Sequence, residues 1–204
     1  MFYYDIKYPY LRYPFHETDG SVWFMYSIPV TELAKIYQSY YGKMPKSFFD
    51  CGAAIGELVH QATNLGMDAR GIDIKKYPVE KFESEQKYVK YFQSGRIKIT
   101  NILDCPPPIT DLAYCNGTLT YMTETTLPMA LQKFKNVGML VAIHNTSEDI
   151  LNAQKMGEEL LHAEPRLIRP INWWLYTLNK NGFDADFDKK YGAFWAIPRN
   201  NKTR

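Results

Sequence analysis

The chain has 204 residues, of which 46% are hydrophobic and 23% charged, and its formal net charge is +2. These values are typical of one globular domain that buries its own core, and they exclude a disordered or fibrous chain. The near-neutral charge argues against a long polyanion as the main partner, although it leaves room for a local basic patch.

Three cysteines, Cys51, Cys105 and Cys115, form no CxxC pair. Their odd number and spacing favour a reducing compartment and argue against a disulfide framework or a zinc site. The first residues lack the layout of a signal peptide, and no apolar run approaches the roughly 20 residues that span a bilayer. The sequence therefore predicts a cytoplasmic protein that is neither membrane-bound nor metal-binding, while its oligomeric state stays open.

The N-terminal part, residues 1–45, is rich in aromatic side chains and contains the turn signal ETDGS. Residues 31–41 have apolar residues at helical spacing, and Gly42 can end this helix. We expect this segment to pack on or cover the functional site of a domain at 46–204. A lid over the site and simple packing on one flank of the sheet are the two alternatives, and we expect a mixture in which a few of these aromatic side chains line the pocket.

From residue 46, short apolar runs alternate with helical patterns. We expect strands at 46–51, 68–74, 96–102, 110–115 and 139–144, and helices at 56–66, 79–95, 124–138, 147–162 and 172–182. Two further strands, 183–188 and 191–198, follow each other without a helix, so the last one should be antiparallel. This order predicts a Rossmann-like three-layer α/β sandwich of about seven mostly parallel strands. In such sheets, ligands bind outside the carboxyl ends of the strands.

The stretch DCGAAIG joins the first of these strands to its helix. Gly52, Ala54 and Gly56 permit a tight turn and a close approach to the backbone. Free amides at the start of the helix would favour an anionic group. The alternative is a tight turn without any ligand.

Acidic residues follow the next two strands. Asp73 ends the second strand about 20 residues after the turn, where an acid can accept hydrogen bonds from both hydroxyls of a ribose. Ile74 then offers an apolar face to a base. Asp104 comes after the third strand and either accepts from the exocyclic amine of an adenine or is an ordinary turn residue before three prolines.

The stretches DCGAAIG, GIDI, ILD and DLAYCNGTLTYM together resemble the class I S-adenosylmethionine-dependent methyltransferase family, small-molecule branch, over residues 46–198. The resemblance implies that S-adenosylmethionine is the cofactor and S-adenosylhomocysteine the product. It also implies the cofactor contacts. Asp50, Gly52, Ala54 and Gly56 would surround the methionine end, Asp73 would hold the ribose, Ile74, Asp104 and Cys105 would frame the adenine, and Asn116 would face both methionine and substrate.

Three departures from known patterns bear on this resemblance. The family usually has glycine at the position of Ala54. Alanine at this position resembles the variant seen in some ribose 2′-O-methyltransferases. The Lys-Asp-Lys-Glu set of those enzymes has no match, because YCNGT lacks the Asp expected after the fourth strand. The Asp/Asn-Pro-Pro-Tyr motif of amino-group DNA methyltransferases is absent too. A nicotinamide-binding fingerprint fits less well, because Glu57 takes the place of its last small residue.

His144 ends the apolar strand at 139–144 and is the candidate general base, with a turn-capping role as the alternative. Tyr121, Glu124, Asn145 and Arg169 are candidate substrate contacts. We expect methyl transfer to an oxygen or nitrogen atom of a small molecule or of a glycan or lipid precursor. The alternatives are an RNA methyltransferase, which would need a basic stripe near the site, and a non-catalytic cofactor-binding protein of the same fold.

Overall fold

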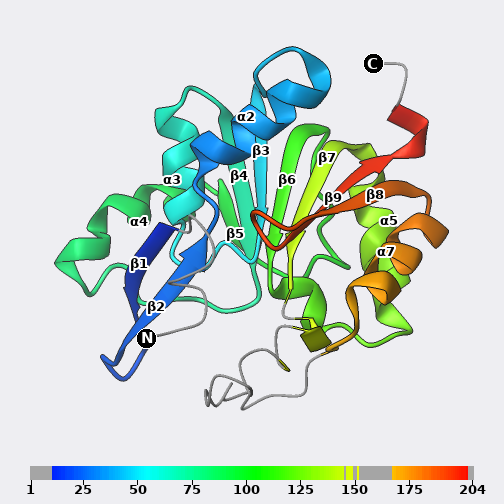
Figure 1. The fold of residues 1–204 in the computed structure, drawn as a ribbon. Helices are drawn as coiled ribbons and strands as arrows, with labels where there is room; N and C mark the ends of the chain where they lie inside the picture. Colours follow the sequence, from blue (N-terminus) through cyan, green and yellow to red (C-terminus); the bar gives the residue numbers. More distant parts are fainter. Residues whose placement is uncertain (1–10, 145, 149–150, 152–166, 202–204) are drawn as a thin grey trace.

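The structure, a computed structural model, describes residues 11–144, 146–148, 151 and 167–201 (Figure 1). Among these residues, a seven-stranded sheet has the order β5-β4-β3-β6-β7-β9-β8. Its strands are β3 (Ser47–Cys51), β4 (Asp68–Asp73), β5 (Ile97–Ile99), β6 (Thr110–Asn116), β7 (Val137–Ile143), β8 (Phe183–Asp188) and β9 (Ala193–Pro198). Strands β3 to β7 pair in parallel, and β9 is antiparallel to both β7 and β8. The predicted sandwich with an antiparallel last strand is therefore confirmed.

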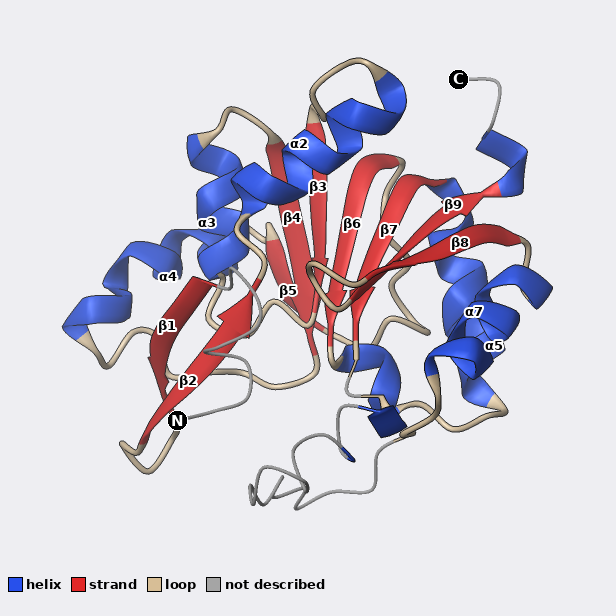
Figure 2. Cartoon of the chain, viewed as in Figure 1, coloured by secondary structure: helices blue, strands red, loops and turns tan. Residues whose placement is uncertain are grey.

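Helices cover both faces of this sheet (Figure 2). One face carries α2 (Val30–Tyr41), α3 (Glu57–Asn64) and α4 (Gln86–Gln93), and the other carries α5 (Thr126–Lys133) and α7 (Ile171–Lys180). The side chains of neighbouring residues in a strand point to opposite faces of the sheet. Phe48 packs in the cluster with α2 and α3, whereas Phe49 packs in the cluster with α5 and α7. Both side chains are buried, which explains why the central strands read as continuous apolar runs.

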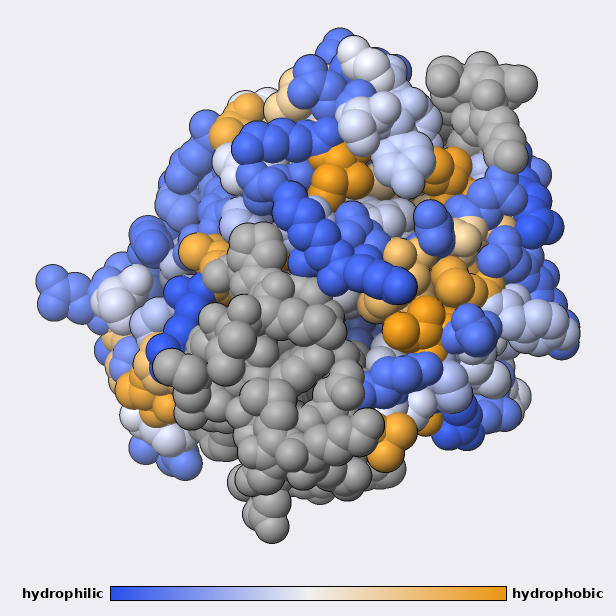
Figure 3. Space-filling model, viewed as in Figure 1, coloured by the Kyte–Doolittle hydropathy of each residue, from blue (hydrophilic) through white to orange (hydrophobic). Residues whose placement is uncertain are grey.

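The N-terminal segment forms a separate two-stranded antiparallel sheet, β1 (Leu11–His16) and β2 (Val22–Ser27). The predicted ETDGS turn joins these strands, with the Glu17 amide donating to the Ser21 carbonyl. This hairpin lies on the same side of the sheet as α3 and α4 (Figure 1). Figure 3 shows hydrophilic residues over α2 on this face and a group of apolar residues on the β8–β9 side.

Three predicted elements differ most from the expected lengths. The helix at 79–95 is reduced to the 3-10 turn η1 (Glu83–Glu85) followed by α4. The strand at 96–102 is only β5, because Asn101 starts a turn in which its side chain accepts from the Leu103 amide and its carbonyl accepts from the Asp104 and Cys105 amides. The helix at 124–138 ends earlier, as α5 and the 3-10 turn η3 (Phe134–Asn136), since Val137 already pairs with Thr110 in the sheet.

The remaining elements are the 3-10 turns η2 (Thr118–Tyr121) and η4 (Arg199–Asn201). Most of the helix expected at 147–162 lies outside the described residues. Within the described part of the chain, no helix has both the length and the apolar character that crossing a membrane requires.

Candidate functional site

The turn between β3 and α3 is built from left-handed backbone. Gly52 has a φ of 93°, Ala54 of 46° and Gly56 of 94°, and Ala54 is the one non-glycine residue with a positive φ among the described residues. The amides of Gly52 and Ala53 both donate to the Ile72 carbonyl at 2.9 Å, which fixes the turn on the end of β4. Small residues are needed here because side chains disfavour this conformation.

Gly52 also leaves room for another residue of the chain. A Cβ atom at Gly52 would lie 2.1 Å from the Thr118 hydroxyl oxygen, and that hydroxyl donates to the Cys51 carbonyl at 2.8 Å. Thr118 begins η2, directly after β6, and sequence reasoning missed it because the contact joins segments that are far apart in the chain. The close approach expected at Gly52 is therefore made, at least on its Cβ side, by Thr118.

Asp73 is held in a defined orientation at the carboxyl end of β4. Its Oδ2 accepts from the Ala54 amide and its Oδ1 from the Lys75 amide, both at 2.8 Å. Burial raises the pKa of this carboxyl, and the two backbone hydrogen bonds oppose the rise. Each oxygen retains the capacity to accept one further hydrogen bond, which suits a pair of neighbouring hydroxyls. The next side chain, Ile74, is 71% exposed and available to a planar group.

Asp50 is buried near the end of β3, opposite Gly71 and Tyr114 in the sheet register. Burial and the negative charge of Asp73 raise its pKa to about 8. No described cationic side chain forms an ion pair with it. A positively charged group of a ligand beside Asp50 would therefore be stabilised and would lower this pKa.

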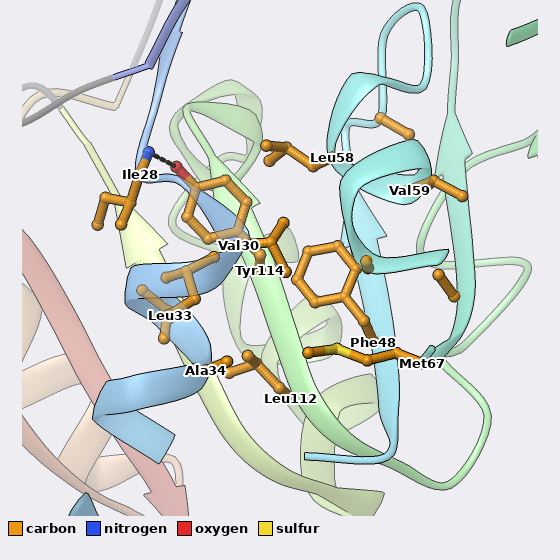
Figure 4. Packing of buried hydrophobic residues seen from close by; sticks show 14 of the residues in the cluster. Ile28, Val30, Leu33, Ala34, Phe48, Leu58, Val59, Met67, Leu112 and Tyr114 are labelled. Atoms are coloured by element: carbon orange, nitrogen blue, oxygen red, sulfur yellow. Dashed lines mark hydrogen bonds between the residues drawn. The ribbon is translucent and has the colours of Figure 1, made fainter. Parts of the chain in front are cut away.

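Asn116 ends β6 and contacts the N-terminal hairpin. Its side-chain amide donates to the Tyr26 carbonyl at 2.6 Å and to the Ser27 hydroxyl at 3.2 Å. The hydroxyl of Tyr114 accepts from the Ile28 amide at 3.2 Å, as Figure 4 shows. Because a carbonyl can only accept, these contacts fix which end of the Asn116 amide faces the hairpin, and only its oxygen remains to accept from a ligand.

The hairpin is also tied to the segment that follows Asp73. Glu17 forms an ion pair with Lys75, and Phe15 packs edge-on against Tyr77 at 5.5 Å. Burial and the charges of Asp73 and Glu17 raise the pKa of Tyr77, which lies in the loop that follows Asp73. Sequence reasoning missed Tyr77, and its place four residues after Asp73 was the available signal.

A second anchor of the hairpin is buried. Glu85 is 2% exposed, and its Oε1 accepts from both the backbone amide and the Nδ1 atom of His16, at 2.7 and 2.8 Å. The His16 ring stacks on Phe82 at 4.0 Å. The hairpin is thus attached near the ends of β4 and β6 and at the start of α4.

His144 follows β7, as expected, but it does not lie at an open edge. It is 2% exposed and stacks on Trp174 at 4.0 Å and on Phe194 at 5.3 Å. Neither ring nitrogen has a hydrogen-bond partner within the described residues. Burial lowers its pKa to about 3, so the ring is neutral at pH 7 and a weak base. This placement differs from the expectation of a base that emerges into the site.

The remaining predicted residues lie in the segments that follow β5, β6 and β7. Asp104 is exposed and Cys105 half-buried, both in the turn that follows β5, and Tyr121 is 46% exposed in η2. Arg169 and Glu124, 45 residues apart, form an ion pair at 2.6 Å that neutralises both charges. Asn145 lies outside the described residues. Among the described residues, no group of three His, Cys, Asp or Glu side chains is placed to hold a metal ion.

Comparisons with known proteins address the fold. No family model matches the sequence, and no curated protein matches it. A sugar N-methyltransferase from Streptoalloteichus is 13% identical with a TM-score of 0.59, over 83% of this chain and 86% of that chain. Magnesium protoporphyrin IX methyltransferase from Synechocystis is 16% identical with a TM-score of 0.56, over 82% of both chains. A small RNA methyltransferase is 13% identical with a TM-score of 0.56, over 82% of this chain and 24% of that chain. The chain therefore has the fold of class I S-adenosylmethionine-dependent methyltransferases.

Proposed function

We propose that the protein binds S-adenosylmethionine at the carboxyl ends of β3, β4 and β6 and transfers its methyl group to a small molecule or to a glycan or lipid precursor. The main support for this proposal is the orientation of Asp73 at the end of β4. The amides of Ala54 and Lys75 each donate to one of its two carboxylate oxygens. Crystal structures of similar fold, such as the magnesium protoporphyrin IX methyltransferase, contain bound S-adenosylhomocysteine.

The residues present suit the parts of this cofactor. Asp73 would accept from the ribose hydroxyls, and the exposed Ile74 would contact the adenine, together with Asp104 and Cys105 of the following loop. Asp50, buried without a cationic partner among the described residues, would lie near the positively charged methionine end. When bound, the cofactor supplies an activated methyl group, and the protein's part is to align the acceptor and exclude water.

The N-terminal hairpin would close this site on one side. Its contacts with Asn116 and Lys75 attach it beside two of the strand ends that hold the cofactor. The oxygen of Asn116 would then accept a hydrogen bond from the acceptor or from the methionine end. This arrangement supports the role of a cover for the hairpin, β1 and β2, whereas α2 packs on the sheet with buried residues such as Leu33.

The chemistry of the acceptor decides whether a base is needed. A neutral amine is already nucleophilic, whereas a hydroxyl must lose a proton. His144 is less suitable as that base than the sequence indicates, because its ring lies between Trp174 and Phe194 and its pKa is lowered to about 3. Tyr121, Glu124 and Arg169 remain candidate contacts for the acceptor.

Calorimetric titration with S-adenosylhomocysteine tests this proposal. We expect micromolar binding to the wild type and a loss of about tenfold or more in Asp73→Asn, because one ribose hydroxyl loses a charged acceptor. Asp68→Asn is the matched control, since it makes the same change at the exposed opposite end of β4. Equal affinities for the wild type and Asp73→Asn would contradict the ribose assignment, and no binding to a folded wild type would favour a non-catalytic role.

A further inference from the structure

Positive charge is concentrated in the connection between β4 and β5. Residues 75–98 contain six lysines, one arginine and three glutamates, a net charge of +4, whereas the rest of the chain has a net charge of −2. All seven basic side chains are exposed, and one of the three acids, Glu85, is buried against His16. The surface around α4 and β5 is therefore basic, although the net charge of the whole chain is small.

Part of this basic charge is not neutralised. Lys75, Lys76 and Lys87 each form an ion pair, with Glu17, Glu80 and Glu57 respectively. The other four, Lys81, Lys90, Arg96 and Lys98, form no ion pair with a described residue. Exposed cations without a partner attract a polyanion, because binding releases the counterions that the polyanion holds.

A pocket of about 620 Å³ opens within this surface, between α4, β5 and the loop after β4. Its apolar walls include Tyr77 and Phe92, and its charged lining consists of Lys98 and of Lys76 paired with Glu80. Lys90 lies on α4 one turn before Gln93, which lines the pocket, and Arg96 directly precedes β5. Aromatic and aliphatic side chains surrounded by cations suit a planar base that is attached to a phosphate.

The edge strand beside the pocket is not suited to pairing with a strand of another protein. β5 has three residues, and its middle residue, Lys98, is exposed. Short edge strands that carry a lysine resist strand addition. The charge and the pocket therefore favour a ligand that brings phosphates and bases over a partner that pairs with the sheet.

We propose that the surface formed by Lys90, Arg96, Lys98 and the adjoining pocket, which Lys76 also lines, docks single-stranded nucleic acid, with a base in the pocket and the phosphates on these three cations, which pair with no described acid. The surface is distinct from the residues assigned to the cofactor, so the inference does not rest on the proposed function. This surface lies beside the loop that follows Asp73. It is a basic stripe of the kind that an RNA methyltransferase, one of the alternative functions, would need.

Fluorescence anisotropy with a labelled oligouridylate of about ten nucleotides tests this inference on the full chain without cofactor. We expect binding at about 50 mM salt that weakens about 20-fold at about 200 mM, as release of counterions from three phosphates requires. Lys76→Glu/Lys98→Glu should weaken binding by about tenfold or more. Lys43→Glu/Lys180→Glu makes the same change of charge at exposed lysines elsewhere and should weaken it less than threefold.

A cooperative thermal unfolding transition shows that a variant is folded. If the charge-reversed variant Lys76→Glu/Lys98→Glu does not fold, Lys76→Gln/Lys98→Gln replaces it in the binding test. Three results would overturn the inference. These are no binding by the wild type at about 50 mM salt, an equal loss in both charge-reversed variants, and competition by poly-L-glutamate that is as strong as competition by unlabelled oligouridylate. The last result would mean that the surface binds acidic chains without using the pocket for bases.

Discussion

Replacing Gly52 with alanine tests whether Thr118 is the reason for the bare backbone in the turn after β3. The new Cβ would lie 2.1 Å from the Thr118 hydroxyl oxygen, in a residue with a φ of 93°. The positive φ costs about 1–2 kcal/mol and the forced displacement of Thr118 about 1–2 kcal/mol more. We therefore expect Gly52→Ala to lower the free energy of unfolding by about 3 kcal/mol.

A double-mutant cycle separates these two costs. Thr118→Ala loses its hydrogen bond to Cys51, about 1 kcal/mol, but it removes the clash. The double variant should then lose about 2.5 kcal/mol instead of the additive 4 kcal/mol, a coupling of about 1.5 kcal/mol. Gly66→Ala is the control for the backbone term alone, because its φ is 81° and nothing lies within 4 Å of the new Cβ. Urea unfolding measures the free energy of unfolding of all four variants. Additive effects of Gly52→Ala and Thr118→Ala would show that Thr118 is not the reason for glycine at position 52.

Three further predictions concern buried polar groups. Because the pKa of Asp50 is raised to about 8, the folded protein keeps a proton on this carboxyl that the unfolded chain has lost by about pH 5. The free energy of unfolding should therefore fall by up to about 1.4 kcal/mol per pH unit as the pH rises from about 5 to about 7. Urea unfolding of Asp50→Asn should lack this slope, and an unchanged slope would show that another group causes it. His144→Phe should keep the stacking on Trp174 and stay within about 1 kcal/mol of the wild type, whereas a loss above 2 kcal/mol would reveal a hydrogen bond of the ring. His16→Ala removes the ring donor to the buried Glu85 carboxyl, to which, among the described residues, only the backbone amide of residue 16 then still donates, and should cost about 2 kcal/mol, with faster proteolysis of the hairpin; an unchanged unfolding midpoint would contradict that anchor.

The parts that sequence reasoning predicted well depend on local signals. The turn at 52–56 and the acid at the end of β4 are specified by glycine placement and strand length, and the structure links them through the hydrogen bond from Ala54 to Asp73. The order of strands and helices followed from hydrophobic period. The antiparallel last strand followed from the lack of a helix between the last two strands.

The parts that it missed depend on contacts between distant segments. The contact of Thr118 with Gly52 joins the ends of β6 and β3, and the burial of His144 depends on Trp174 of α7, 30 residues further along the chain. Periodicity also overestimated β5, because the side chain of Asn101 ends the strand with a local turn. The charge of residues 75–98 was visible in the sequence, but their common surface and pocket required the fold.

The proposed function depends on binding of S-adenosylmethionine at the carboxyl ends of β3, β4 and β6. The most direct test is calorimetric titration of the wild-type protein at pH 7 with S-adenosylhomocysteine and, separately, with NAD. We expect one micromolar site for S-adenosylhomocysteine and no measurable binding of NAD. Binding of NAD alone, or of neither ligand to a protein that unfolds cooperatively, would contradict it.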